Sequence, residues 1–127
     1  MRHNTRFTVA LLLAMLSTVI LPGCGKKADE SKPMSEVKAE AEKMDTAKLR
    51  TMAQQYKSSL TAKKADIDKL MAKVKEIPVT EALGAEAKKL KADIENVQKS
   101  AAALQERFAV YYDKLKEKGG DLSGLDI

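Results

Sequence analysis

The chain has 127 residues and a formal net charge of +5, with one cysteine, one histidine and no tryptophan, and this length suffices for one small domain. Its composition is rich in Ala, Lys, Glu and Leu, which is typical of long helices and coiled coils, and no β-branched run with period-two alternation indicates a sheet. The basic residues are interleaved with Glu and Asp and do not form the dense patch with stacking aromatic side chains that nucleic acid requires, so we expect no nucleic-acid partner.

Residues 1–23 have the three parts of a secretory signal peptide. They begin with a basic stretch containing Arg2 and Arg6, continue with an apolar run from Phe7 to Leu21, and end with small or turn-forming residues. A helix that crosses a bilayer needs about 20 apolar residues, and this run is shorter. We therefore predict a cleaved signal peptide rather than a transmembrane anchor.

The stretch Leu21-Pro22-Gly23-Cys24 resembles the lipobox of bacterial lipoproteins. In that family the leader is cut before the cysteine, and the cysteine then carries acyl chains such as palmitate. The resemblance implies lipid attachment at Cys24 and a membrane as one partner. It also implies an outer-membrane location on the periplasmic side, because Gly25 replaces the Asp that is usual in inner-membrane members. In a cell with one membrane, the location implied is its outer face.

The chain after residue 23 has 21 basic and 18 acidic residues, a net charge of +3. Residues 24–33 are predicted to be the lipidated cysteine and a flexible tether, because residues 25–33 are polar and hold no apolar side chain larger than that of Ala28. Fully extended, these nine residues would span roughly 30 Å.

Two helices are predicted between residues 34 and 77. Apolar residues recur at intervals of three and four from Met34 to Met44, and the phase then slips, which favours a short first helix over one continuous kinked helix. Asp45 is the predicted N-cap of the second helix, and Pro78 should end it. The second helix has one apolar heptad seam: Leu49, Ala53, Tyr56, Leu60, Ile67, Leu70, Val74 and Ile77.

A third helix is predicted from Leu83 to the glycine pair Gly119-Gly120. Its steps alternate strictly between four and three: Leu83, Ala87, Leu90, Ile94, Val97, Ala101, Leu104, Phe108, Tyr111 and Leu115. Two seams of similar length joined by a proline turn predict an antiparallel hairpin. Folding about Pro78 would place Tyr56 opposite Ala101, pairing a large with a small side chain.

The expected fold class is therefore all-α: a coiled-coil-like helical hairpin over residues 34–118 with a short additional N-terminal helix. The C-terminal half of the third helix carries apolar residues outside its seam: Ala102, Ala103, Ala109, Val110 and Tyr112. Either the first helix folds back over them to form a three-helix bundle, or a second copy covers them.

The C-terminal tail, residues 119–127, carries three large apolar side chains. They either pack on the open end of the bundle or form a docking peptide for a partner's groove. The candidate partner contacts are Val110, Tyr112, Leu122, Leu125 and Ile127.

No catalytic group is indicated in the predicted mature chain. The single histidine, His3, belongs to the signal peptide, and acid pairs such as Glu36 and Glu40 are expected on solvated helix faces. We therefore expect no enzymatic activity, metal site or cofactor. The predicted function is a membrane-anchored envelope lipoprotein that acts as a structural or protein-interaction module, partnered by another envelope protein or by itself. The alternative is a helical binding protein for a lipid or another apolar ligand.

Overall fold

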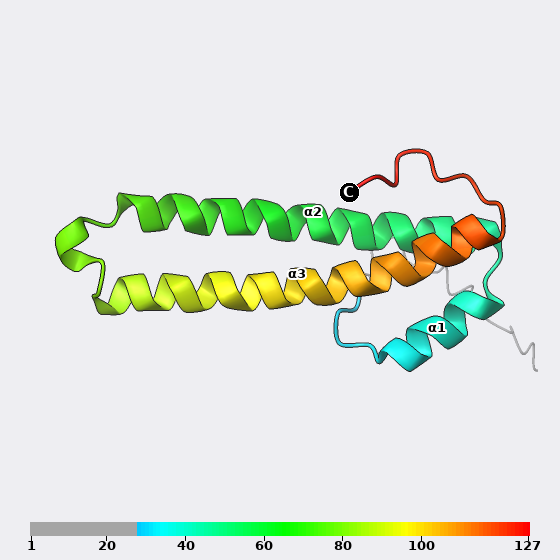
Figure 1. Cartoon of the computed structure of the whole chain (residues 1–127), viewed down its shortest axis with the longest axis horizontal. Coiled ribbons are helices and arrows are strands. Elements are labelled where there is room, and N and C mark those ends of the chain that lie inside the picture. Colours follow the sequence, from blue (N-terminus) through cyan, green and yellow to red (C-terminus); the bar gives the residue numbers. More distant parts are fainter. Residues whose placement is uncertain (1–27) are drawn as a thin grey trace, which may run out of the picture.

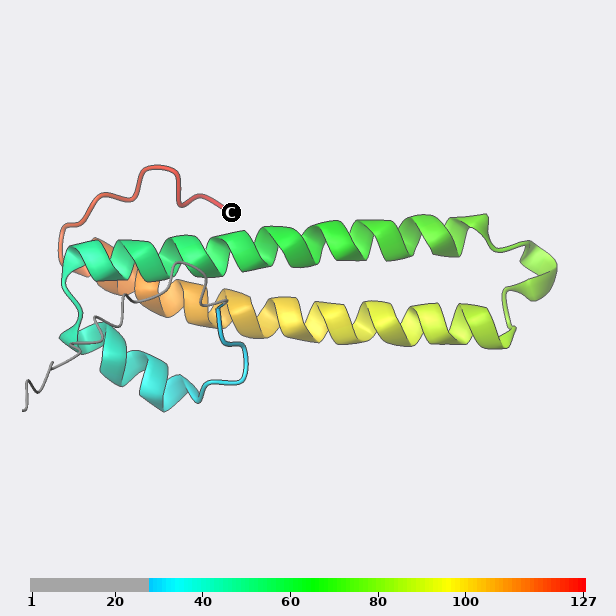
Figure 2. The same cartoon turned by 180° about the vertical axis from the view of Figure 1, so that it is seen from behind.

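The computed structural model describes residues 28–127, which form a long antiparallel pair of helices with a short helix at one end (Figures 1 and 2). Helix α1 spans Met34–Lys43, α2 spans Thr46–Glu76 and α3 spans Ala85–Glu117, with a 3-10 turn at Val79–Glu81. The long helices α2 and α3 pack against each other, and α1 packs on α3. No strand occurs in the described residues. The predicted helical hairpin with an additional N-terminal helix is confirmed.

None of the helices in this part of the chain has an apolar stretch long enough to cross a bilayer. The predicted signal peptide and Cys24 lie outside the described residues.

Helices α1 and α2 are separate because the backbone is extended between them. Met44 has φ −81° and ψ 143°, which ends α1. Asp45 then caps α2, since its carboxylate accepts a hydrogen bond at 2.8 Å from the backbone N–H of Lys48. The short first helix and its neighbouring cap were both correctly predicted, and a single kinked helix does not form.

The connection between α2 and α3 is longer than the sequence pattern predicts. Pro78 ends α2 as expected, and Ile77 before it is extended, with φ −71° and ψ 125°. Leu83, the predicted start of the third seam, instead lies in the connection and is 84% exposed. The reason is Gly84, whose N–H closes a turn onto the Glu81 carbonyl at 2.8 Å and whose own backbone is extended, so that α3 begins only after it.

This longer connection changes the register of the hairpin. Tyr56 stacks on Tyr111, with ring centroids 5.4 Å apart and an interplanar angle of 30°. The predicted partner of Tyr56 was Ala101, so the predicted register is wrong. It assumed a tight turn centred on Pro78, whereas the connection extends to Gly84 and brings residues further along α3 opposite each position of α2.

The base, which we define as residues 28–60 and 101–127, contains the fully packed core. Its buried members come from all three helices and the tail: Val37, Ala41, Leu49, Ala53, Tyr56, Leu60, Leu104, Phe108, Tyr111, Leu115 and Leu125. Helix α1 therefore folds back to form the expected three-helix base. Lys118 of the α3 terminus fixes the end of α1, because its ammonium donates to the Glu42 carbonyl at 3.0 Å and to the Met44 carbonyl at 2.7 Å.

A glycine pair ends α3 and starts the tail. Gly119 has φ +70°, and the N–H of Gly120 bonds the Leu115 carbonyl at 2.9 Å, which is a Schellman motif. A Cβ on Gly120 would lie 2.1 Å from the Leu115 side chain, so the turn also requires a small residue there.

The arm, residues 61–100, is the part of the hairpin that projects beyond the base (Figures 1 and 2). Ala87 is its one buried seam residue, while the larger seam side chains remain partly exposed: Ile67, Leu70, Val74, Leu90, Ile94 and Val97. Two helices without a third element leave these larger seam side chains open to solvent on one side or the other.

Candidate interaction surface

Residues 28–33 lie against the hairpin, which differs from the freely extended tether predicted for residues 25–33. The Tyr56 hydroxyl donates to the Asp29 carbonyl at 3.0 Å, and Arg107 donates to the Lys32 carbonyl through Nε at 3.0 Å and also through Nη2. These two side chains are buried in the base, so their polar atoms need acceptors there. The backbone of a polar segment can supply such acceptors even when its side chains bury little, and the composition of the segment did not reveal this.

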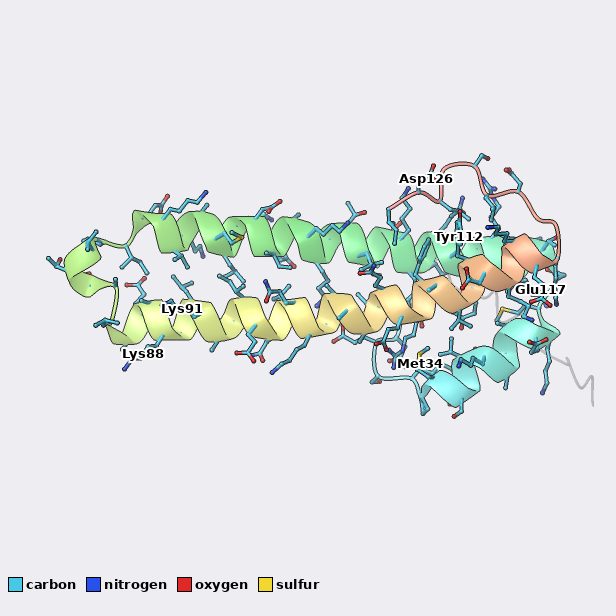
Figure 3. All side chains as sticks on the ribbon, viewed as in Figure 1. Met34, Lys88, Lys91, Tyr112, Glu117 and Asp126 are labelled. Carbon is cyan, nitrogen blue, oxygen red and sulfur yellow. The ribbon has the colours of Figure 1, made fainter. Side chains whose placement is uncertain are left out.

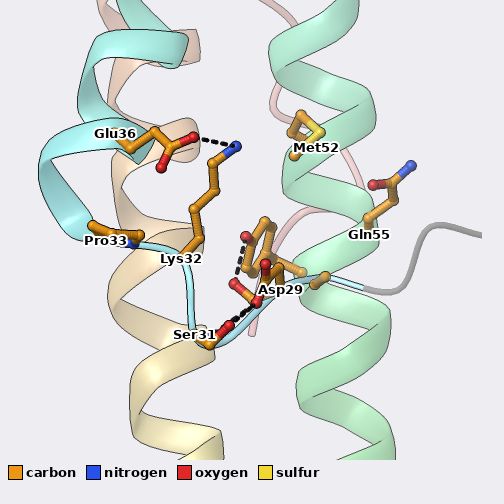
Figure 4. Close-up of a pocket in the computed structure, with 9 residues that line it drawn as sticks. Asp29, Ser31, Lys32, Pro33, Glu36, Met52 and Gln55 are labelled. Atoms are coloured by element: carbon orange, nitrogen blue, oxygen red, sulfur yellow. Dashed lines mark hydrogen bonds and ion pairs between the residues drawn. The ribbon is translucent and has the colours of Figure 1, made fainter.

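A cavity of about 450 Å³ opens between this segment, α1 and α2 (Figure 4). Lys32 points across it, lies 3.9 Å from a Glu36 carboxylate oxygen and hydrogen bonds the carboxylate of Glu40. The hydrogen bond to Glu40 raises the pKa of Lys32 above its usual value. Because two carboxylates already face the ammonium, the cavity has little attraction for an anion.

The two stacked tyrosines are poor acid–base groups near neutral pH. Burial raises the pKa of Tyr111 and that of Tyr56 above their usual value. Both hydroxyls therefore stay protonated, and Tyr56 uses its proton to hold residues 28–33. Within residues 28–127, no group of three or more His, Cys, Asp or Glu side chains is arranged to hold a metal ion.

The C-terminal tail is bound to the outer side of α2 by two cationic side chains. Arg50 pairs with the Asp121 carboxylate at 2.7 Å and donates to the Ser123 carbonyl at 2.9 Å. Lys57, seven residues later on the same side of the helix, donates to the Gly124 carbonyl at 2.8 Å. Gly124 has φ +74°, a conformation that glycine adopts without steric strain, and it turns the chain toward the core.

The five predicted partner contacts have different environments. Leu125 is fully buried in the core of the base, and Leu122, Val110 and Tyr112 are partly buried against the same core. Only Ile127 is largely accessible, at 53% exposure. The tail thus adopts the packed arrangement that the sequence left as one of two options, and Leu125 offers no surface to a partner in this position.

The arm presents a shallow, mostly apolar groove of about 260 Å³ that the sequence did not indicate. It is lined by Met71, Val74 and Lys75 of α2 and by Lys91, Ile94 and Gln98 of α3. Met71 is 46% exposed, which is unusual for a large apolar side chain in this fold. Lys91 points toward α2 across the hairpin, whereas Lys88 points away from it (Figure 3).

Two further apolar side chains are exposed at the tip of the arm. Val79 in the 3-10 turn is 92% exposed, and Leu83 is exposed to a similar degree. Of the exposed large apolar side chains in the described residues, Met71, Val79 and Leu83 thus lie on the arm, and Ile127 lies in the tail.

Comparison of the chain with protein-family models, with curated proteins and with solved structures gave no match.

Proposed function

We propose that the protein is a small lipid-anchored component of the bacterial cell envelope that acts as a structural or protein-interaction module through its arm. One observation carries the proposal: the base buries its own core, while the arm extends beyond it with a partly exposed seam and an exposed apolar tip. A seam that no third helix covers leaves apolar side chains that a partner could bury.

The proposed anchor is Cys24, on the basis of its lipobox-like sequence. Ala28 packs against the core of the base, and four residues of chain from Cys24 can span at most about 14 Å. A lipid on Cys24 would therefore hold the base close to the bilayer, and the arm would reach partners near the membrane surface. Gly25 supports the outer membrane as the location where the cell has one.

Labelling with a palmitate analogue in a bacterial host tests the anchor. The wild-type chain should take up the label and have a mature N-terminus at Cys24, and the Cys24→Ala variant should take up none. A matched control, Ser35→Ala, changes an exposed residue and should be labelled like the wild type. Absence of label from the wild-type chain, or label that persists in Cys24→Ala, would contradict the anchor.

Shortening the arm tests the interaction function. Deleting one heptad from each helix, residues 64–70 and 91–97, keeps the helical phase and leaves every core residue of the base in place. Chemical cross-linking in cells should give a higher-mass species with the wild-type chain that is lost with the shortened arm. An unchanged cross-linking pattern in the shortened variant would contradict a role for the arm.

The alternative function, binding of a lipid or another apolar ligand, stays a prediction. The core of the base is filled by large, fully buried side chains, including Tyr56, Tyr111 and Leu104. An enclosed ligand would have to displace them, and no observation on residues 28–127 favours this function over the first.

A further inference from the structure

We propose that the groove on the arm binds an extended acidic segment of another protein, in which branched apolar side chains lie next to carboxylates. This deepens the proposed interaction function by naming the partner's chemistry, and it does not depend on the lipid anchor.

The floor of the groove requires an apolar occupant. Val74 and Ile94 belong to the seams of the two helices, and Met71 adds its side chain from the edge. A branched aliphatic side chain placed there would remove these atoms from water, which contributes about 25 cal/mol for each Å² buried.

The sides of the groove favour a negatively charged occupant. Lys75 and Lys91 line it, and neither has a carboxylate within 4 Å among the described residues. The acid next to Ile94 in sequence, Glu95, pairs instead with Lys99 at 2.8 Å. The groove thus offers two cations to the carboxylates of a partner and no acidic side chain of its own.

The opposite face of the arm carries charges of both signs. On α2, heptad spacing from Ser59 places Asp66 and Lys73 on this side, and on α3 it places Glu86, Asp93 and Ser100 there. At the end of the arm next to the base this face is covered by residues 28–33, where Ser100 donates to the carboxylate of Glu30. The groove, whose lining holds two lysines and no acid, is therefore more favourable to an acidic partner than this face, where Asp66, Glu86 and Asp93 lie with Lys73.

The C-terminal tail is a segment of this chemistry, and it is bound nearer the start of α2 on the same side of the helix. Arg50, Lys57 and Met71 are spaced by multiples of seven and so lie on one side of the helix. The tail bound by Arg50 and Lys57 has the sequence Asp-Leu-Ser-Gly-Leu-Asp-Ile, and it inserts one leucine into the seam while its carbonyls and one carboxylate take the cations. The groove repeats this combination of an apolar seam and flanking cations without an occupant from residues 28–127.

A second copy of the chain is a less suitable occupant. A two-fold dimer that joined the two grooves would bring Lys75 and Lys91 of one copy against the same residues of the other, because symmetry pairs identical surfaces. Like charges directly opposed across an interface disfavour that arrangement.

The test uses the full chain in phosphatidylcholine nanodiscs and a fluorescently labelled peptide, Asp-Leu-Ser-Gly-Leu-Asp-Ile, titrated by fluorescence anisotropy. The Lys75→Glu/Lys91→Glu variant should bind the peptide at least tenfold more weakly than the wild type. The charge-matched control Lys69→Glu/Lys89→Glu changes two exposed lysines outside the groove and should stay within twofold of the wild type. A peptide with Asn in place of both Asp residues should also bind at least tenfold more weakly.

Equal binding by the groove variant and the wild type would overturn the proposal, because the peptide would then occupy another site such as that of the tail. Three other outcomes would also overturn it. Equal loss in the control variant would indicate non-specific charge attraction. Displacement of the peptide from the wild type by a short-chain phosphatidylglycerol, but not by the phosphatidylcholine of the same chain length, would assign the groove to lipid. Cross-linked dimers that disappear only in the groove variant would assign it to a second copy.

Discussion

Replacing Arg107 by Met should separate residues 28–33 from the base. Arg107 is 7% exposed, and its guanidinium donates to the Lys32 carbonyl and, at 2.7 Å, to the Ala103 carbonyl. Methionine retains much of the aliphatic volume but has no donor. The variant therefore removes the hydrogen bonds and leaves the packing of α3 largely intact.

The expected loss follows from the Lys32 carbonyl. The Ala103 carbonyl belongs to α3 and keeps its helical partner, so its bond to the guanidinium is of minor importance. A hydrogen bond to a charged group contributes about 1.5–3 kcal/mol. The loss cannot exceed the docking free energy of residues 28–33, because the segment can detach while the base stays folded. We expect about 2 kcal/mol, which for a domain of this size lowers Tm by roughly 10 °C.

Two measurements on the fragment 25–127, which contains the whole core, check this expectation. Urea unfolding followed by circular dichroism gives the free energy of unfolding. Cleavage after Glu30 by a glutamate-specific protease reports on the segment itself, and it should be at least tenfold faster in Arg107→Met. Exposed Lys38→Met is the control for loss of a cation and should change neither quantity.

A double variant decides whether the effect passes through the segment. Tyr56→Phe keeps the ring on Tyr111 but removes the hydrogen bond to the Asp29 carbonyl. If both side chains act by holding the same six residues, the double variant with Arg107→Met should lose less than the sum of the two single losses. Additive losses, or unchanged cleavage after Glu30 in Arg107→Met, would refute the reasoning.

The remaining predictions concern the tail, the tyrosine pair and a helix cap. Leu125→Ala should lower the free energy of unfolding by about 2 kcal/mol, toward the low end for a buried leucine because the tail can detach, and a loss larger than that from deleting residues 121–127 would contradict it. Because burial raises the pKa of Tyr56 and Tyr111 in the fold, the contribution of these two groups to stability should be fully present below about pH 10 and be lost above it, where the unfolded chain loses these protons first. Melting curves between pH 8 and 11 should show this fall, and Tyr111→Phe should reduce its slope. Asp45→Ala should cost about 1 kcal/mol in urea unfolding, and Asp45→Asn, which keeps the accepting oxygen, less than half of that.

The sequence predicted those features of the fold that local chemistry decides. Asp45 as a cap and Pro78 as a helix terminator act within one turn of the chain, so their effects follow from the residues themselves. The register of the hairpin was not predictable in the same way. It depends on where the connection ends, and the closed turn at Gly84 displaced Leu83 from the seam that its spacing matched.

The candidate surface was less predictable than the fold, because a side chain is exposed only where no other segment of the chain packs on it. Apolar residues near the end of α3, such as Tyr112, were expected to be available, but the tail and α1 take up much of that surface. Met71 directly follows the seam residue Leu70, and the sequence pattern did not indicate a binding site there. A residue beside the seam lines a groove only when no third helix packs against it. The role of Arg107 was equally difficult to predict, because it depends on the Lys32 backbone carbonyl, which no side-chain pattern reveals.

The arm is accessible to a partner and has limited stability of its own. Both properties follow from the absence of a third helix beside it. Lys63 occupies a seam position where the base ends, and it reaches out to a Glu30 carboxylate oxygen at 3.9 Å instead of packing inside. Beyond it, Ala87 is the one buried apolar side chain of the arm, so opening the arm exposes much less new apolar surface than opening the base. Amide exchange in the arm should therefore proceed through local opening at a lower free energy than in the base. An occupant of the groove would supply the missing third element and slow amide exchange in the arm. Binding would thus reduce local opening of the arm without any movement of the base.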